Sequence, residues 1–434
     1  MNTQTSNKKV SKFTNSWWND FETQTENFSK HSLFKNAFNS EEVNYINKLV
    51  EDVIKKVTSD EKRQSYLRIW KNGKYNKSKS KFFKKNPIGK NESILEWKKR
   101  LFNDDKFGLF LNNANSHSEE LSALLHDYLK PYFDEYGMPT NGFSTTIILG
   151  DYGWTPLGIH RDNIGEHIIH FHLGPGEKDI YIWDKEKSDK YGYVDFKRTE
   201  NFDDFINDYS HKTSFKTGDI FSMLGKNVHI GNTHEFSIGL VVEFNGLTEK
   251  EFLRKMWFNL GNDLFHKNFK GDKAKILPAY TESSHSDYLN FLYKGIKHFN
   301  IDTGHIIKDA LKNKCLDHKY TLLSNNGFLL SPYVDNIKIK KKYKKIGMKS
   351  SIKLMDTYKI LYYTNDNEIN LFIRGVKFKT QNNPEVISFV DKLNTGGVLI
   401  IEEIKNNFFD NWDKSAVFKL LYVFYKLKGL KIQF

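Results

Sequence analysis

The chain has 434 residues, of which 38% are hydrophobic, with 35 Phe and 22 Tyr, so we expect a folded protein of about two to four domains. Its one cysteine, Cys315, excludes an internal disulfide framework, and no run of about eighteen apolar residues could span a membrane. The formal net charge of +13 is compatible with a nucleic-acid partner, but lysine is abundant along the whole chain, which favours a solvated basic surface. The first twenty residues lack the apolar run of a secretion signal, so we expect a cytoplasmic protein.

The first 135 residues predict mainly helices. A helix start at Ser40 is followed by apolar residues at helical spacing, namely Val43, Ile46, Leu49, Val50, Val53 and Ile54. A second periodic segment runs from Ser118 to Phe133, with Pro131 near its end. Between these helices, residues 65–75 (SYLRIWKNGKY) predict a short strand and turn, and residues 76–91 predict a polar, basic loop.

From Gly142 the hydrophobic pattern changes to the period of two that is typical of strands. Five short runs predict strands separated by Gly, Pro and Asp turns: residues 142–150, 167–174, 179–184, 218–224 and 237–244. Helical periodicity does not interrupt them. The spacing therefore predicts an antiparallel barrel or sandwich.

The C-terminal third returns to helices and then mixes both patterns. Helical periodicity resumes at Thr248 and continues with interruptions to about residue 325. Residues 357–375 predict two strands across an Asn/Asp turn, and Pro384 begins a helix that is followed by two more helical stretches. This order is similar to a winged helix-turn-helix. Residues 413–427 are apolar on most faces, which predicts a buried helix rather than one that reads DNA.

Four histidines lie between Thr155 and Asp184 (TPLGIHRDNIGEHIIHFHLGPGEKDIYIWD). Residues two apart on a strand share a face, so His160 and Asp162 would present an imidazole and a carboxylate together. These groups are two of the three ligands of the 2-His-1-carboxylate triad that binds Fe(II). A third ligand must come from another strand, and His229 is the better candidate; His234, five residues later, is the weaker one.

The combined pattern resembles the JmjC/cupin-type Fe(II)/2-oxoglutarate oxygenases, and within them the ribosomal oxygenase group. The residues that carry the resemblance are the HRD sequence, a GxK-like turn, Gly218–Asp219 and a histidine ten residues after that aspartate. The N-terminal sequences WWNDF and KHSLFKNAF are also similar to that group. The resemblance covers nearly the whole chain in architecture, but the sharp motifs lie between about residues 144 and 244.

The resemblance implies an α+β fold built around a double-stranded β-helix (jelly-roll or cupin) barrel. Four parts are expected: a mainly helical N-terminal part of the oxygenase domain, the barrel core, a helical dimerisation segment and a winged-helix-like domain, at residues 1–135, 136–247, 248–330 and 331–434. Apolar residues of the third part would form a homodimer interface, namely Phe252, Met256, Phe258, Leu260, Leu264 and Phe265. The alternative is that this segment packs as a lid within one chain.

The same resemblance implies Fe(II) and 2-oxoglutarate as cofactors, with His160, Asp162 and His229 as the metal ligands and catalytic residues. Lys178 would bind the far carboxylate of 2-oxoglutarate, assisted by a hydroxyl of Thr155, Thr146 or Thr145. The lysine lies three residues farther from the HRD sequence than is usual, so a surface lysine is the alternative, and His172 or Arg161 are other candidate cations. His167, His170 and His172 are expected to line the pocket or the surface rather than bind metal.

The implied activity is hydroxylation of an amino-acid side chain in a protein or peptide, either a ribosomal protein or the precursor of a ribosomally made natural product. Three alternatives remain open: a cupin that binds a ligand or metal without oxygenase chemistry, a ligand-sensing regulator that binds nucleic acid through the winged helix, and an oxygenase of nucleic-acid bases. The basic residues Lys338–Lys345 would contact an acidic peptide, the ribosome or RNA, or would only form a solvated strand edge. No membrane partner is expected.

Overall fold

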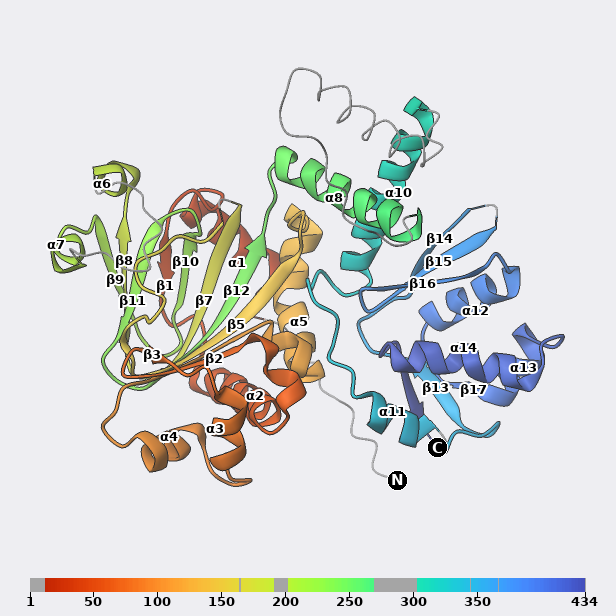
Figure 1. Cartoon of the computed structure of the whole chain (residues 1–434), viewed down its shortest axis with the longest axis horizontal. Helices are drawn as coiled ribbons and strands as arrows, with labels where there is room; N and C mark the ends of the chain where they lie inside the picture. Colours follow the sequence, from red (N-terminus) through yellow and green to blue (C-terminus); the bar gives the residue numbers. More distant parts are fainter. Residues whose placement is uncertain are drawn as a thin grey trace, which may run out of the picture.

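The computed structural model describes residues 12–163, 165–190, 202–268, 303–343, 345–365 and 367–433. These residues form a mixed α+β fold with antiparallel sheets, which confirms the predicted class (Figure 1). None of the helices in these ranges is both long enough and apolar enough to cross a bilayer.

Two antiparallel sheets face each other in the N-terminal half of the molecule (Figure 1). The larger has eight strands in the order β1 (Ser32–Phe34), β10 (Ile220–Leu224), β7 (Glu166–Pro175), β12 (Ser237–Asn245), β5 (Phe143–Gly150), β4 (Phe107–Asn112), β2 (Leu67–Lys71) and β3 (Lys74–Tyr75). The smaller has the order β6 (Gly153–Trp154), β11 (Val228–Thr233), β8 (Lys178–Trp183) and β9 (His211–Phe215). The two sheets remain separate, so the described residues form no closed barrel.

Alternation along the strands gives the larger sheet two apolar faces. One face packs against helices α1 (Asn15–Thr25), α2 (Ser40–Thr58) and α5 (Glu119–Tyr136), where Leu109, Ile147 and Leu240 are fully buried. On the other face, Ile168, Met223 and Val241 form a second cluster with residues of the smaller sheet, namely Ile180, Ile182 and Phe215. The space between the sheets is therefore partly filled by apolar side chains, and the remainder is a cavity.

Most predicted elements of this half are confirmed. Helix α2 begins after Asn39, which forms a capping box with Glu42, and all six predicted apolar positions from Val43 to Ile54 are buried. The five predicted strands correspond to β5, β7, β8, β10 and β12, and residues 65–75 form the hairpin of β2 and β3. Pro131 lies within α5 rather than at its end.

Other predictions for this half were wrong or incomplete. Residues 79–85 form helix α3 (Lys79–Lys85) instead of a loop, and strand β4 lies in the part that was predicted to be mainly helical. Two short helices, α6 (Lys185–Lys190) and α7 (Phe202–Asn207), separate β8 from β9, where no helix was expected.

The C-terminal part contains two three-stranded sheets and a group of helices. The first sheet has the order β17 (Leu399–Ile400), β13 (Ser351–Leu354) and β18 (Leu430–Gln433). The second has the order β14 (Leu361–Thr364), β15 (Glu368–Ile373) and β16 (Val376–Gln381). The predicted hairpin and the helix beginning at Pro384 are confirmed as β14–β15 and α12 (Pro384–Asn394), and α13 (Ile401–Phe408) and α14 (Lys414–Lys426) follow. Val417, Leu420, Leu421 and Phe424 of α14 are buried. Residues 336–343 form helix α11 (Asn336–Tyr343), so the expected strand edge at the lysine run was wrong.

Helices α8 (Glu249–Asn268) and α10 (Thr303–Leu323) connect the two parts of the molecule (Figure 1). Of the residues expected at a dimer interface, Met256 and Leu260 are buried within this single chain, while Phe258 is 69% exposed. Trp257 and Leu253 are also exposed, at 51% and 56%. The side chains of Leu264 and Phe265 lie outside the described residues. An exposed apolar face is present, and the dimer stays a prediction.

Replacing the fully buried Ile46 of α2 by alanine is expected to lower the free energy of unfolding by about 2–4 kcal/mol, because it leaves a cavity between the helix and the sheet. Lys48→Ala on the exposed side of the same helix is the matched control, with an expected change within about 0.5 kcal/mol. Urea denaturation followed by circular dichroism measures both variants. Equal effects would contradict the assigned buried face.

Candidate metal centre

The backbone brings His160 and His229 together. His229 is the second residue of β11, and His160 forms an isolated antiparallel bridge with it. The two residues exchange backbone hydrogen bonds, with N···O distances of 3.0 Å from His160 to His229 and 2.7 Å in the reverse direction. The amide of Asp162 donates to the carbonyl of Gly225 over 2.7 Å. Asp162 itself lies outside any strand, so the shared face of the HRD sequence results from these anchors rather than from a regular strand.

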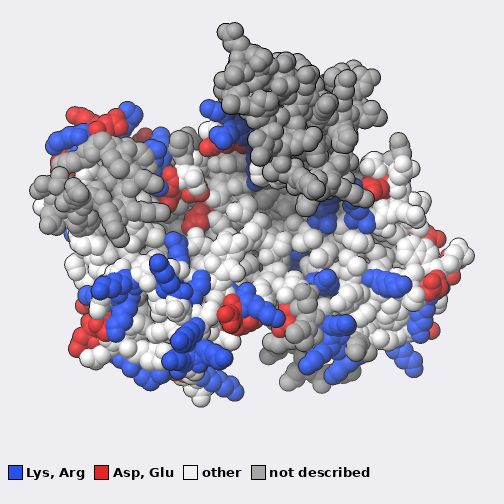
Figure 2. Space-filling view, in the orientation of Figure 1, with Lys and Arg blue, Asp and Glu red and all other residues white. Residues whose placement is uncertain are grey.

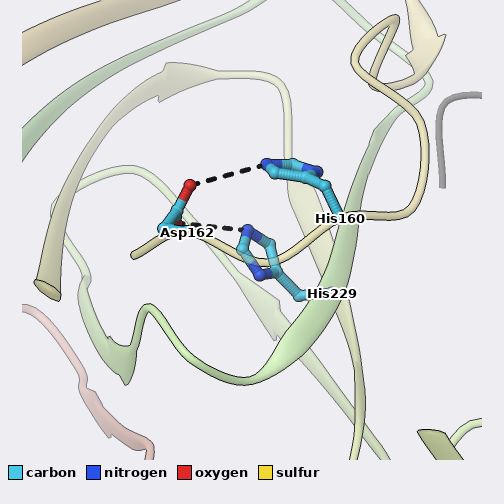
Figure 3. Close-up of side chains that lie close together, drawn as sticks. All are labelled: His160, Asp162 and His229. Atoms are coloured by element: carbon cyan, nitrogen blue, oxygen red, sulfur yellow. Dashed lines mark ion pairs between the residues drawn. The ribbon is translucent and has the colours of Figure 1, made fainter. Parts of the chain in front are cut away.

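The three predicted ligands converge (Figure 3). His160 Nε2 lies 3.8 Å from Asp162 Oδ1, and His229 Nε2 lies 3.8 Å from Asp162 Oδ2. All three ligand atoms lie within 4.8 Å of one another. Within the described part of the chain, this is the one group of three or more His, Cys, Asp or Glu side chains with such a spacing.

The hydrogen bonds on the far side of each imidazole decide which nitrogen carries the proton. His160 Nδ1 lies 2.8 Å from the carbonyl oxygen of Gly158, and His229 Nδ1 lies 2.9 Å from that of Asn227. A carbonyl oxygen only accepts, so each Nδ1 carries the proton and each Nε2 presents a lone pair. In this tautomer the two Nε2 atoms and the Asp162 carboxyl group face one point. The donor set fits the 2-His-1-carboxylate type of divalent metal site.

Burial shifts the pKa values of two of the three candidate ligands. Burial, followed by the nearby His160, lowers the pKa of His229 to about 3, so that His229 is neutral at physiological pH. Burial raises the pKa of Asp162, and the neighbouring His160 partly opposes that shift. A bound cation would favour the charged form of Asp162 that burial disfavours. The centre therefore offers a neutral imidazole and a carboxylate that a cation would stabilise.

Gly225 makes room for the carboxylate ligand. A Cβ atom at this position would lie 3.0 Å from the Cβ of Asp162 and 2.9 Å from the carbonyl oxygen of Glu166. Any larger residue would therefore push the Asp162 backbone away from its anchor. The glycine is part of the arrangement that holds the ligand in place.

The three candidate metal ligands lie on the wall of a cavity of about 150 Å³ between the two sheets. Lys178, at the start of β8, is 5% exposed and lines this cavity, so it is not a surface lysine. Its Nζ donates to the hydroxyl of Tyr152 over 3.3 Å, and no acidic residue within the described ranges forms an ion pair with it. Gly231 opposite leaves space for the lysine, because a Cβ there would lie 3.0 Å from Lys178 Cε.

The predicted threonines divide between the two faces of the sheet. Thr155 lines the cavity and donates to the carbonyl of Gly231 over 2.9 Å. Thr146 also lines it and donates to Glu243 Oε1 over 2.7 Å. Thr145 points to the other face of β5, where its hydroxyl donates to Asn115. Thr155 and Thr146 therefore remain candidates for contact with a ligand in the cavity, and Thr145 does not.

Of the remaining histidines, His170 lines the cavity. It is 4% exposed, and its Nε2 has no hydrogen-bond partner among the residues that the structure describes. A Cβ at Gly239 would lie 2.4 Å from the His170 ring, so this glycine creates the space that the ring occupies. His172 is fully buried and bonded through Nε2 to the Gly176 carbonyl, and burial lowers its pKa to about 4.

The other expected alternatives lie away from the cavity. His167 packs against Phe28 on the helical side of the sheet, with ring centroids 4.5 Å apart. His234 is exposed in the turn after β11, and Arg161 is exposed as well. Lys178 is therefore the predicted cation that the structure places in the cavity.

Sequence reasoning missed three polar residues that line the same cavity, namely Arg68, Asn112 and Glu243. Arg68 on β2 donates to Asn112 Oδ1 on β4 over 2.8 Å. Glu243 on β12 accepts hydrogen bonds from Ser144 and Thr146 over 2.6 and 2.7 Å, and burial raises its pKa. The period of two in each strand places these residues opposite the core-facing positions. This alternation within a strand does not show which strands border the cavity.

No protein-family model matches the sequence, and no curated protein matches it. Among solved structures, Escherichia coli YcfD matches with 13% sequence identity over 96% of this chain and 98% of its own, at a TM-score of 0.46. YcfD, a ribosomal oxygenase from Escherichia coli, in complex with cobalt and 2-oxoglutarate, matches with 13% identity, the same coverage and a TM-score of 0.43. The coconut allergen cocosin matches with 9% identity over 32% of this chain and 26% of its own, at a TM-score of 0.20.

Replacing His160, Asp162 or His229 by alanine is expected to weaken Co(II) or Mn(II) binding by at least about a hundredfold, because two ligands cannot hold the ion that three surround. Calorimetric titration of the metal-free protein measures the affinity, and circular dichroism checks the fold. His234→Ala, in the exposed turn, is the control and is expected to bind as the wild type does. An unchanged metal affinity of the His229→Ala variant would show that another residue is the third ligand.

Proposed function

We propose that this protein is an Fe(II)- and 2-oxoglutarate-dependent oxygenase that hydroxylates an amino-acid side chain of a protein or peptide. One observation carries the proposal: three potential metal-ligand atoms meet on the wall of a cavity that also contains a buried lysine, which has no acidic partner among the described residues. A metal ion would bind the three ligand atoms, and an anionic co-substrate would pair with the lysine. 2-Oxoglutarate supplies a chelating keto acid for the metal and a second carboxylate for the lysine.

In this proposal His160, Asp162 and His229 hold the iron on one side and leave the positions facing the cavity open. The bound iron and 2-oxoglutarate would activate O₂, so that one oxygen atom enters succinate, CO₂ is released and the other oxygen atom is inserted into a C–H bond of the substrate. The protein holds the ligand atoms and excludes bulk water. The backbone bridge between the two histidines and the Gly225 anchor of Asp162 perform the first task.

Lys178 is the proposed partner of the far carboxylate of 2-oxoglutarate. A buried ammonium group that has only a neutral hydroxyl as partner is unfavourable, and a carboxylate would offset the cost of its burial. The hydroxyl of Thr155 and the unpartnered Nε2 of His170 line the same cavity and offer hydrogen bonds to the same co-substrate. Thr146 contacts Glu243 and is proposed only to support the wall.

The substrate side chain would meet the remaining polar wall of the cavity, made of Arg68, Asn112 and Glu243. The volume of about 150 Å³ lies below the range of roughly 300–1,000 Å³ that drug-sized ligands occupy. With the co-substrate in place, the space suits the end of an amino-acid side chain and not a nucleotide. A ribosomal protein and a natural-product precursor peptide are both candidate substrates.

The finer architecture is also proposed. We assign the strands of the two facing sheets that lie within residues 136–247 to a double-stranded β-helix, residues 1–135 to the mainly helical N-terminal part that adds strands to the larger sheet, and residues 331–434 to a winged-helix-like domain. The exposed Leu253, Trp257 and Phe258 of α8 support a homodimer through residues 248–330. A nucleic-acid regulator is the second candidate function, but the buried apolar residues of α14 do not favour it.

The test of the proposed function is turnover of peptides by the iron-loaded protein under air. Peptides from ribosomal proteins, or from small open reading frames beside the gene, are expected to gain the mass of one oxygen atom, with an equal amount of succinate formed from 2-oxoglutarate. Asp162→Ala, which removes a metal ligand, is expected to abolish both products. Tight duplex DNA binding at physiological salt without any turnover would favour the regulator instead.

Lys178→Ala is expected to weaken 2-oxoglutarate binding to the Mn(II)-loaded protein by about a hundredfold, because a charge-assisted contact worth about 3 kcal/mol is lost. Binding of 2-oxobutyrate, which lacks the far carboxylate, is expected to change little. The control is Lys216→Ala, which removes an exposed lysine that pairs with Glu177. If the variant binds both keto acids as the wild type does, the carboxylate is held elsewhere, with Arg68 as the next candidate.

A further inference from the structure

The segment from Lys71 to Lys90 is strongly basic, as is the segment of residues 336–355, which also contains eight lysines and no acidic residue. The segment from Lys71 to Lys90 contains eight lysines and no acidic residue in twenty positions (KNGKYNKSKSKFFKKNPIGK). The whole chain has 53 acidic residues in 434, so a segment of this length would hold about two on average. Within these twenty positions no acidic residue offsets the lysine charges.

The structure places this segment on the β2–β3 hairpin and helix α3. Lys74, Lys77, Lys81, Lys84 and Lys85 are exposed, and within the described ranges none of them forms an ion pair. Two neighbouring lysines are already engaged: Lys71 pairs with Asp105 at 2.6 Å, and Lys79 donates to the Leu67 carbonyl. Figure 2 shows Lys and Arg side chains gathered on the lower left of the molecule, where Figure 1 places the hairpin and α3.

The basic segment is continuous with the wall of the cavity. Phe110 lines the cavity and contacts Trp70 of β2, with ring centroids 4.9 Å apart. Trp70 in turn contacts Tyr75 of β3 at 5.6 Å, and Tyr75 is 44% exposed beside Lys74. The cavity-lining Arg68 precedes Trp70 by two residues on the same face of β2. A chain whose side chain enters the cavity would therefore extend over the hairpin.

We propose that the β2–β3 hairpin and α3 form a docking surface for an acidic stretch of the polypeptide substrate, next to the residue that enters the cavity. This inference rests on the proposed function for the identity of the partner. The unpaired lysines supply the complementary charge, which attracts the partner and orients it before the reacting side chain enters. The substrate class is then a peptide or protein with several Asp or Glu residues close to the modified position.

The same charge would attract RNA, and two observations favour the peptide. The cavity that adjoins the hairpin is too small for a nucleotide beside a co-substrate. The surface also uses lysine alone, whereas bidentate recognition of phosphate groups generally employs arginine. A partner that continues directly from the cavity onto the hairpin is thus a polypeptide chain.

The experiment compares two variants that change the net charge equally. Lys74, Lys77 and Lys81 are replaced by glutamate in one, and Lys340, Lys341 and Lys345 in the other. The second group is also exposed and lies on α11 or just after it. A fluorescent oligoglutamate peptide and an oligouridine of equal charge serve as probes in anisotropy titrations at about 50 mM salt.

The hairpin variant is expected to bind oligoglutamate at least about tenfold more weakly than the wild type, and the α11 variant less than about twofold more weakly. Replacement of the hairpin lysines by alanine is expected to give an intermediate loss, which separates a charge effect from damage to the fold. Equal losses in the two glutamate variants, or no peptide binding by the wild type, would overturn the inference. Tighter binding of oligouridine, lost in the hairpin variant, would make the surface a nucleic-acid site.

These titrations use the metal-free protein, so they do not depend on turnover. Peptide binding with no oxygenase activity would leave the docking surface in place and reject the proposed function alone. Turnover of a neutral peptide as fast as of an acidic one, by the wild type at low salt, would reject the docking surface and keep the function.

Discussion

The candidate metal centre depends on the reciprocal backbone hydrogen bonds between His160 and His229. They join a segment outside the regular strands to β11, and with the anchor of Asp162 they fix three side chains from two distant parts of the sequence. The backbone also sets the protonation of both rings, since each Nδ1 donates to a carbonyl two residues before its own histidine. Geometry and chemistry of the centre therefore follow from main-chain contacts. Changes on the cavity wall can alter the ligand that is bound while the three metal ligands stay in place.

The larger sheet borders both the cavity and the helical core of the N-terminal half. Its strands place one set of residues against α1, α2 and α5 and the alternate set toward the cavity. Because the helices cover one face completely, the polar groups that a ligand needs are confined to the other face. Glu243 and Thr146 illustrate the result: Glu243 lies between the core residues Val242 and Phe244, and Thr146 donates to it from the neighbouring strand. The cavity can thus contain several polar groups without weakening the helical core.

The sequence allowed the local features to be predicted and left the long-range ones open. The capped helix at Ser40, the five strands and the group of His160, Asp162 and His229 have short-range patterns. Strand β11 was not predicted because Gly231 and Asn232, which disfavour strands, interrupt VHIGNT; pairing with β8 and β6 stabilises it. The lysine-rich sequence of helix α3 predicts a loop because its one buried apolar residue, Phe83, gives no helical pattern. In the structure Phe83 stacks on Trp97, with ring centroids 5.9 Å apart, and this contact stabilises the helix. The cavity positions of Arg68 and Asn112 depend on the order β5-β4-β2, which no local pattern contains.

The cavity is lined by residues that precede the C-terminal part in the sequence. Each cavity-lining residue in the described ranges lies between Arg68 and Glu243 in the sequence, so none comes from the last two sheets. Instead the C-terminal part is attached to the helical side of the large sheet through Arg374, which is 2% exposed, pairs with Glu119 of α5 at 2.9 Å and lies over the Tyr358 ring. The buried guanidinium of Arg374 forms this ion pair with a glutamate side chain that is 37% exposed, and the contact attaches the C-terminal part to α5. A partner bound by the C-terminal part would be held in a fixed position relative to the cavity, and its contribution would be to binding rather than to the chemistry.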